Sequence, residues 1–270
     1  MEKLALLLLA FTVVFQISGQ LPVSSGVRQN GLANTTVTLT DVWAVRNNPG
    51  AFAFMKASQA SLTYQNRFIV SELSTQNLAY GHHMKNGNIG VYLQHTGFNL
   101  FRSIQTGATY SLALSPRLGM GISGNYQQTR FGDIYGVKHH FTANLGVMYI
   151  LNKAISVGAS ILNINRSKIS DFENERLPTV FTIGAQYNIS KKVLWLIDVE
   201  KEIASAVNIK SALELEAHEN FDIRMGINTY PFQSAFGFGI HLDNLSIDMA
   251  AIWHSTIGLT PSLGIIYSFK

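Results

Sequence analysis

The 270-residue sequence contains no cysteine and few charged residues. Without thiols the chain can form no disulfide, no thiolate metal site and no lipidated cysteine after a signal sequence. Charged residues make up 13% of the chain, against roughly 25% in ordinary soluble domains, whereas hydrophobic residues make up 47%. The formal net charge is only +4 and the Lys and Arg residues are scattered, so we expect no nucleic-acid partner.

Long apolar runs are also scarce, and the clearest one lies at the N-terminus. A charged start precedes an apolar run over residues 4–15, and the small residues Ser18 and Gly19 follow it. This pattern predicts a secretory signal peptide over residues 1–19. A retained membrane anchor is the alternative, although the run is short for a transmembrane helix.

From residue 57 onward, apolar residues alternate with small or polar ones. Ile89, Val91 and Leu93 would face one side of a strand while the intervening residues face the other. The alternation predicts an all-β fold, a 14-stranded antiparallel transmembrane β-barrel over residues 57–269, with residues 20–56 as a short N-terminal plug. A soluble β-sandwich would share the alternation. The expected strands lie near residues 57–67, 73–82, 87–97, 103–114, 116–128, 137–151, 153–164, 177–190, 192–202, 206–218, 221–230, 233–242, 245–254 and 259–269.

The connections between these segments differ in length. Those after the even-numbered segments are tight, whereas two of the others are long, over residues 129–136 and 165–176. Outer-membrane barrels have short periplasmic turns and longer external loops. We therefore expect a location in the bacterial outer membrane, contact with its lipids, and both ends of the barrel chain on the periplasmic side. Trp195 and Trp253 fit the aromatic girdles of such barrels, and aromatic Phe269 ends the last segment.

A short motif lies ahead of the first segment. It consists of Asp41, Trp43 and the sequence Asn48-Pro49-Gly50. The motif resembles the N-terminal signature of the PorV/PorQ-type proteins of Bacteroidota, within the FadL-like group of fourteen-stranded barrels, although Gly here directly follows Pro, where the family usually has Ala. The resemblance implies a hatch in the periplasmic end of the barrel. Asp41 would be the N-cap for residues 42–44, and Pro49 would lie in a turn or in the first turn of a helix. The alternative is a packing motif without chemistry.

The resemblance implies two functions. PorV-like members work with the type IX secretion system, whereas FadL proper passes hydrophobic small molecules across the outer membrane. Because the external loops are short, we predict an accessory or scaffolding subunit of a type IX-like secretion system, with secretion-system, periplasmic or lipoprotein partners, and keep the transporter as the alternative. Partner contacts are expected on the periplasmic turns and at residues 48–50, or on the longest external loop. The charged residues of that loop are Asp171, Glu173, Glu175 and Arg176.

Polar residues on the inward face of the later segments are candidates for chemistry. Cross-strand neighbours can pair opposite charges there, so we interpret them as a satisfied polar lumen. The pairs His82-His83 and His139-His140 point to opposite faces of their strands and make poor metal ligands. We therefore expect no enzyme, no cofactor and no metal site. The inward polar residues are Asp198, Glu200, Lys210, Glu214, Glu216, Asp222, Arg224, His241, Asp248 and His254.

Overall fold

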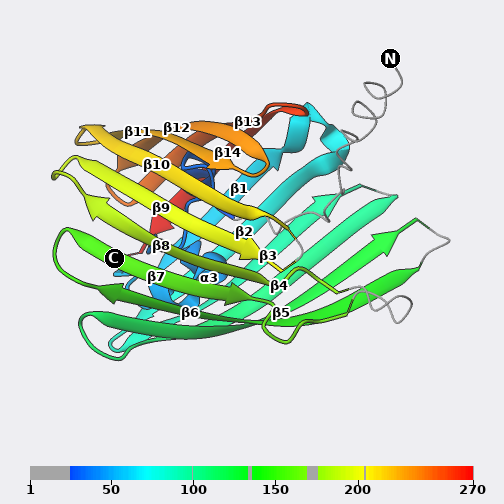
Figure 1. The fold of residues 1–270 in the computed structure, drawn as a ribbon, viewed down its shortest axis with the longest axis horizontal. Helices are drawn as coiled ribbons and strands as arrows, with labels where there is room; N and C mark the ends of the chain where they lie inside the picture. The colour runs from blue at the N-terminus through cyan, green and yellow to red at the C-terminus, as the bar shows by residue number, and fades with distance from the viewer. Residues whose placement is uncertain (1–24, 99, 133–135, 169–175, 204, 270) are drawn as a thin grey trace, which may run out of the picture.

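Fourteen antiparallel strands form a closed barrel in which β1 pairs with both β2 and β14 (Figure 1). The computed structural model describes residues 25–269 except 99, 133–135, 169–175 and 204, so the predicted signal peptide lies outside the described residues. The predicted barrel is confirmed. The strands are β1 (Gln59–Asn66), β2 (Ser74–Met84), β3 (Gly87–Gly97), β4 (Phe101–Ala113), β5 (Leu118–Phe131), β6 (Val137–Ile150), β7 (Ile155–Leu162), β8 (Val180–Asn188), β9 (Val193–Glu202), β10 (Val207–His218), β11 (Phe221–Thr229), β12 (Phe232–Leu242), β13 (Leu245–His254) and β14 (Gly258–Ser268).

The strand alternation places large apolar side chains on the outside of the barrel. On β12, Phe236 and Phe238 are exposed, whereas the intervening Gly237 is buried. The same order recurs around the barrel and leaves a continuous apolar outer surface, which only lipid can cover favourably. The chain is therefore a transmembrane barrel of the bacterial outer membrane. Among the described residues, no helix is long and apolar enough to span a membrane.

The two ends of the barrel differ in their connections. At the end where β1 begins and β14 ends, the strands are joined by two to four residues, as between β2 and β3 or β4 and β5. At the opposite end, the chain between β7 and β8 is long, whereas only two or three residues separate β3 from β4, β11 from β12 and β13 from β14. The predicted short turns at one end of the barrel are confirmed, whereas the expected long connections at the other end are found only in part. That the short-turn end faces the periplasm stays a prediction.

The predicted strand boundaries agree with the structure to within three residues. The largest departures are the end of β5 and the start of β8. The expected loop over residues 129–136 is wrong at its start, because β5 continues to Phe131 and Arg130 pairs with Val137 of β6. Polar side chains interrupt the alternation of apolar and polar residues there. The backbone hydrogen bonds between β5 and β6 continue all the same, because they do not depend on side-chain type.

Residues 25–56 lie inside the barrel as a plug (Figure 1). The plug contains three short helices, α2 (Val27–Gly31), α3 (Ala44–Asn47) and α4 (Pro49–Phe52), along with turns. Two short 3-10 segments, η1 (Arg67–Ile69) and η2 (Ser71–Leu73), connect β1 and β2 at the outer end. The largest apolar cluster of buried residues joins Trp43 and Phe52 of the plug to Tyr92 and Met148 of the wall. The apolar core of the molecule is therefore the contact between plug and barrel.

Candidate functional site

The Asn48-Pro49-Gly50 sequence anchors the plug to the barrel wall. The Asn48 carboxamide oxygen accepts a hydrogen bond from the Gly50 amide at 2.9 Å, so Asn48 caps α4, which the sequence analysis had not predicted. Pro49 occupies the first turn of α4, as predicted. The Asn48 carboxamide nitrogen donates to the Val37 carbonyl at 2.5 Å and to the Val147 carbonyl of β6 at 3.3 Å. One fully buried side chain thus joins two parts of the plug and the wall.

The backbone of α4 lies directly against glycines of the wall. A methyl group on Gly50 would lie 2.4 Å from the Val147 Cα, and one on Gly121 would lie 2.4 Å from the Pro49 carbonyl oxygen. Glycine is required at such a close approach because a side chain on either surface would separate them. The plug fills the space beside the inward-facing glycines at positions 119, 121, 158 and 237, whereas Gly239 faces charged side chains of the barrel.

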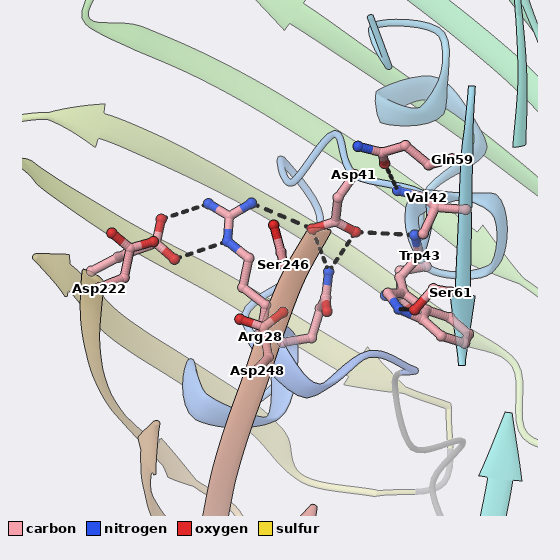
Figure 2. Close-up of polar contacts among 12 residues, drawn as sticks. Arg28, Asp41, Val42, Trp43, Gln59, Ser61, Asp222, Ser246 and Asp248 are labelled. Carbon is pink, nitrogen blue, oxygen red and sulfur yellow. Dashed lines mark hydrogen bonds and ion pairs between the residues drawn. The ribbon is translucent and has the colours of Figure 1, made fainter. Parts of the chain in front are cut away.

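Asp41 organises the turn ahead of α3 (Figure 2). Its carboxylate accepts a hydrogen bond from the Trp43 amide at 3.0 Å, and the Val42 amide donates to the Gln59 side chain at 2.9 Å. The Trp43 indole is buried and donates to the Ser61 hydroxyl of β1 at 3.0 Å. The predicted role of Asp41 as the N-cap for residues 42–44 is wrong, because α3 begins at residue 44 and its N-cap is Trp43. The Asp41 carboxylate instead holds the turn over residues 42–43 through the Trp43 amide.

Arg28 links the plug to β10, away from the Asn48 contact on β6. Its guanidinium donates two hydrogen bonds to Glu214 of β10, at 2.8 and 2.6 Å, and a third to Asp41 at 3.3 Å. Gln29 also donates to Asp41 at 2.8 Å. Burial raises the pKa of Asp41, and the Arg28 charge opposes that rise. Burial alone would lower the pKa of Arg28, but Glu214 and Asp41 outweigh it and hold this pKa above its usual value.

The polar residues of the barrel wall continue this network. Arg224 is buried and pairs with Glu214 at 2.7 Å, with Asp222 at 3.1 Å and with Asp248. His241 lies 2.7 Å from Asp222. The predicted pairing of these inward charges is observed. Arg28 was not predicted as part of the network, because no recognisable motif surrounds it in the sequence.

A second group of charges holds the middle of the plug. The buried Asp198 carboxylate accepts hydrogen bonds from the backbone amides of Thr36 and Val37, at 2.7 and 3.1 Å. Its cross-strand neighbour Lys210 pairs with Glu200 at 2.7 Å. In the described part of the chain, no ion pair joins the other two predicted residues, at positions 216 and 254, to either group. They lie near opposite ends of the barrel, away from the plug contacts.

These groups are arranged as structural contacts between the plug and the barrel. Each buried charge already binds an opposite charge or a backbone amide, which lowers the cost of burying it. Within the described residues, no three His, Asp or Glu side chains are placed to hold a metal ion. The pair His139-His140 divides between the two faces of its strand, because His139 contacts the outward-facing Tyr126 and His140 contacts the Lys168 carbonyl.

Above the plug, toward the outer end, the lumen wall is mostly uncharged and polar. Asn77 donates to Thr63 at 2.9 Å, and Asn228 donates to Gln233 at 3.1 Å. Such carboxamides and hydroxyls offer hydrogen bonds without a net charge. The inward carboxamide residues of this region are Gln65, Asn77, Gln94, Gln105, Asn125, Gln127, Asn144, Asn208, Asn228 and Gln233.

In fold, the chain is similar to solved outer-membrane transporter barrels. It is similar to the toluene transporter TbuX of Ralstonia pickettii, with a TM-score of 0.74 and 11% identity over 92% of this chain and 99% of that one. The toluene transporter TodX of Pseudomonas putida has a TM-score of 0.68 at 11% identity, over 92% and 99% of the two chains. A Pseudomonas aeruginosa FadL homologue has a TM-score of 0.66 at 11% identity, over 93% and 99%.

At these identities the likeness concerns the fold alone. No protein-family model matches the sequence, and no curated protein matches it either. The three solved structures support the FadL-like part of the sequence prediction and do not bear on its PorV/PorQ-type part.

Proposed function

We propose that this chain transports small hydrophobic molecules across the bacterial outer membrane. The observation that carries the proposal is the likeness to two toluene transporters over nearly the whole of each chain, including a closed barrel. Because one fold can serve several functions, the likeness supports the transporter without excluding other roles. The likeness favours a transporter, which the sequence offered as the alternative, over a secretion-system subunit.

The polar wall of the lumen bears on how strongly a hydrophobic molecule would bind there. Plug contacts to β6 and β10 occupy the middle and the periplasmic half of the lumen, so a solute entering from outside first meets the polar wall above the plug. Carboxamides that remain hydrogen-bonded gain little from an apolar solute. We therefore expect brief, weak retention in the outer half of the lumen instead of tight binding there.

An uptake experiment tests the proposal. The protein would be expressed in a bacterial strain that lacks its own hydrophobic-compound transporters, and uptake of labelled toluene and of a labelled trisaccharide would be compared with the empty-vector strain. We expect faster toluene uptake and unchanged sugar uptake. Toluene uptake equal to the control at confirmed surface expression would refute the proposal, and faster uptake of the sugar alone would indicate a channel for polar solutes.

The secretion-system subunit is the second candidate, supported by the resemblance at residues 41–50. Asn48, Pro49 and Gly50 are buried against the wall, so the expected partner contact at these residues is unavailable, and the periplasmic turns are the remaining surface at that end. Of the charged external loop, residues 171–175 lie outside the described residues, and Arg176 donates to the Arg166 carbonyl at 2.7 Å. A mild-detergent pulldown with mass spectrometry tests this candidate through stoichiometric recovery of secretion or lipoprotein partners. That the protein is not an enzyme stays a prediction.

A further inference from the structure

Basic residues occupy four consecutive turns at the short-turn end of the barrel. These turns join β2 to β3, β4 to β5, β6 to β7 and β8 to β9, so they are neighbours around the barrel. Each carries at least one exposed Lys or Arg, whereas the turns from β10 to β11 and from β12 to β13 carry Glu219 and Asp243 and no basic residue. The basic half-ring, as we name this set, consists of Lys85, Arg117, Lys153, Lys191 and Lys192.

The basic half-ring has no acidic partner in the described part of the chain. No ion pair found there includes any of its five side chains. The strands from β2 to β8 contain no Asp or Glu, so the wall beside these turns offers no carboxylate. Neighbouring like charges repel one another, so an external anion would stabilise this end of the barrel.

Apolar side chains next to the basic half-ring place it at the edge of the membrane. Leu114, Leu151 and Ile189 are exposed, and each lies within three residues of a half-ring cation. They continue the outward-facing alternation of β4, β6 and β8, so the lipid-facing surface extends as far as the turns. The cations therefore lie where the apolar surface ends, at the level of the lipid head groups.

Tyrosines mark the same level on the four strands that lead into the basic turns. Tyr80, Tyr110, Tyr149 and Tyr187 are exposed, and each lies within four residues of the end of its strand. Tyrosine favours membrane interfaces because its ring is apolar and its hydroxyl is polar. The strands β10 and β12, which lead into the acidic turns, contain no tyrosine. Cations and interfacial rings thus occur together on one half of the barrel.

We propose that the basic half-ring binds the head groups of anionic phospholipids in the leaflet at the short-turn end, which we expect to be the inner leaflet of the outer membrane. Lys and Arg beside a membrane attract anionic lipids, and a phosphate accepts charge-assisted hydrogen bonds from them. The apolar stems of these side chains can lie along the acyl region while their charges meet the phosphates. Glu219 and Asp243 repel the same lipids, so anionic lipid collects on one half of the barrel. The site lies outside the lumen and does not depend on the transported molecule.

Native mass spectrometry of the detergent-purified barrel tests the proposal, with phosphatidylglycerol and phosphatidylethanolamine of identical acyl chains in competition. Each cation that a lipid contacts should contribute about fivefold, so a lipid on two cations should be preferred by about twentyfold. A variant that keeps only Lys85 of the half-ring should lower this preference to about fivefold or less. This variant is Arg117→Gln/Lys153→Gln/Lys191→Gln/Lys192→Gln.

A matched control removes the same charge from exposed positions near the opposite end of the barrel and should keep the preference of the unaltered protein. The control is Arg102→Gln/Lys138→Gln/Arg166→Gln/Lys168→Gln. Glycerol phosphate, the head group without acyl chains, should not displace the lipid, because the site combines cations with an apolar surface. Heat-dependent gel mobility would confirm that each variant is folded.

Three results would overturn the proposal. The first is equal binding of the two lipids by the unaltered protein, which would point to an acidic protein segment as the occupant. The second is an equal loss of preference in the matched control, because the effect would then follow net charge and not this site. The third is displacement of the lipid by glycerol phosphate, because the cations would then bind a free phosphate. Retained preference in Lys153→Arg/Lys191→Arg/Lys192→Arg would support the proposal.

Discussion

Replacement of Arg28 by Gln should weaken the attachment of the plug to the barrel. The substitution keeps a polar side chain but removes the charge that neutralises Glu214 and Asp41. Both carboxylates are largely buried, with side chains 11% and 9% exposed. A carboxylate left in such surroundings loses hydration without a full set of partners, so the docked plug becomes less favourable.

The magnitude follows from what remains after the substitution. Removal of one partner of a buried ion pair costs about 3–5 kcal/mol. Glu214 keeps its contact with Arg224, and the Arg28 side chain is 24% exposed, so solvent already screens part of the interaction. We therefore expect a loss of about 2–3 kcal/mol in the free energy of unfolding, which corresponds to roughly 30- to 140-fold in the equilibrium constant.

Denaturant titration in lipid vesicles measures this loss, and single-channel recording in planar bilayers measures the position of the plug. Arg28→Gln should unfold at a lower denaturant concentration and show more frequent conductance events. Lys56→Gln is the matched control, because it removes an exposed cation from the end of the plug. If both variants unfold at the same denaturant concentration, the pairing of Arg28 with Glu214 does not hold the plug.

Two further substitutions test the contacts of the motif residues. Gly50→Ala places a methyl group against the Val147 backbone, so it should destabilise the barrel by about 3 kcal/mol, whereas Gly124→Ala, which meets open space, should change the free energy of unfolding little; equal effects in denaturant titration would contradict the close approach. Trp43→Phe removes the hydrogen bond to Ser61 and part of a buried ring, so it should cost about 1–2 kcal/mol and lower the thermal midpoint; an unchanged midpoint would show that this bond contributes nothing net.

The prediction of the barrel succeeded because its signal is local and repeated. Alternation at period two assigns each side chain to a face from its sequence neighbours alone, and fourteen repeats reinforce one another. Capping by Asn48 and the position of Pro49 were also open to sequence analysis, since both act within one helical turn. The strand ends were less certain, as β5 showed, because pairing with a neighbour can extend a strand past its apolar pattern.

The contacts between plug and wall could not be predicted, because they join residues far apart in the chain. Arg28 and Glu214 are separated by 186 positions, and no spacing rule relates them. The alternation showed that Glu214 and Arg224 face inward, but the choice among several inward acids depends on where the plug places its own arginine. By itself the sequence determined the barrel and the inward face of the polar residues on its strands, since these follow from neighbours along the strand. Only the tertiary structure decided which charges pair and which glycines the plug approaches, because those contacts depend on the register and closure of the whole barrel.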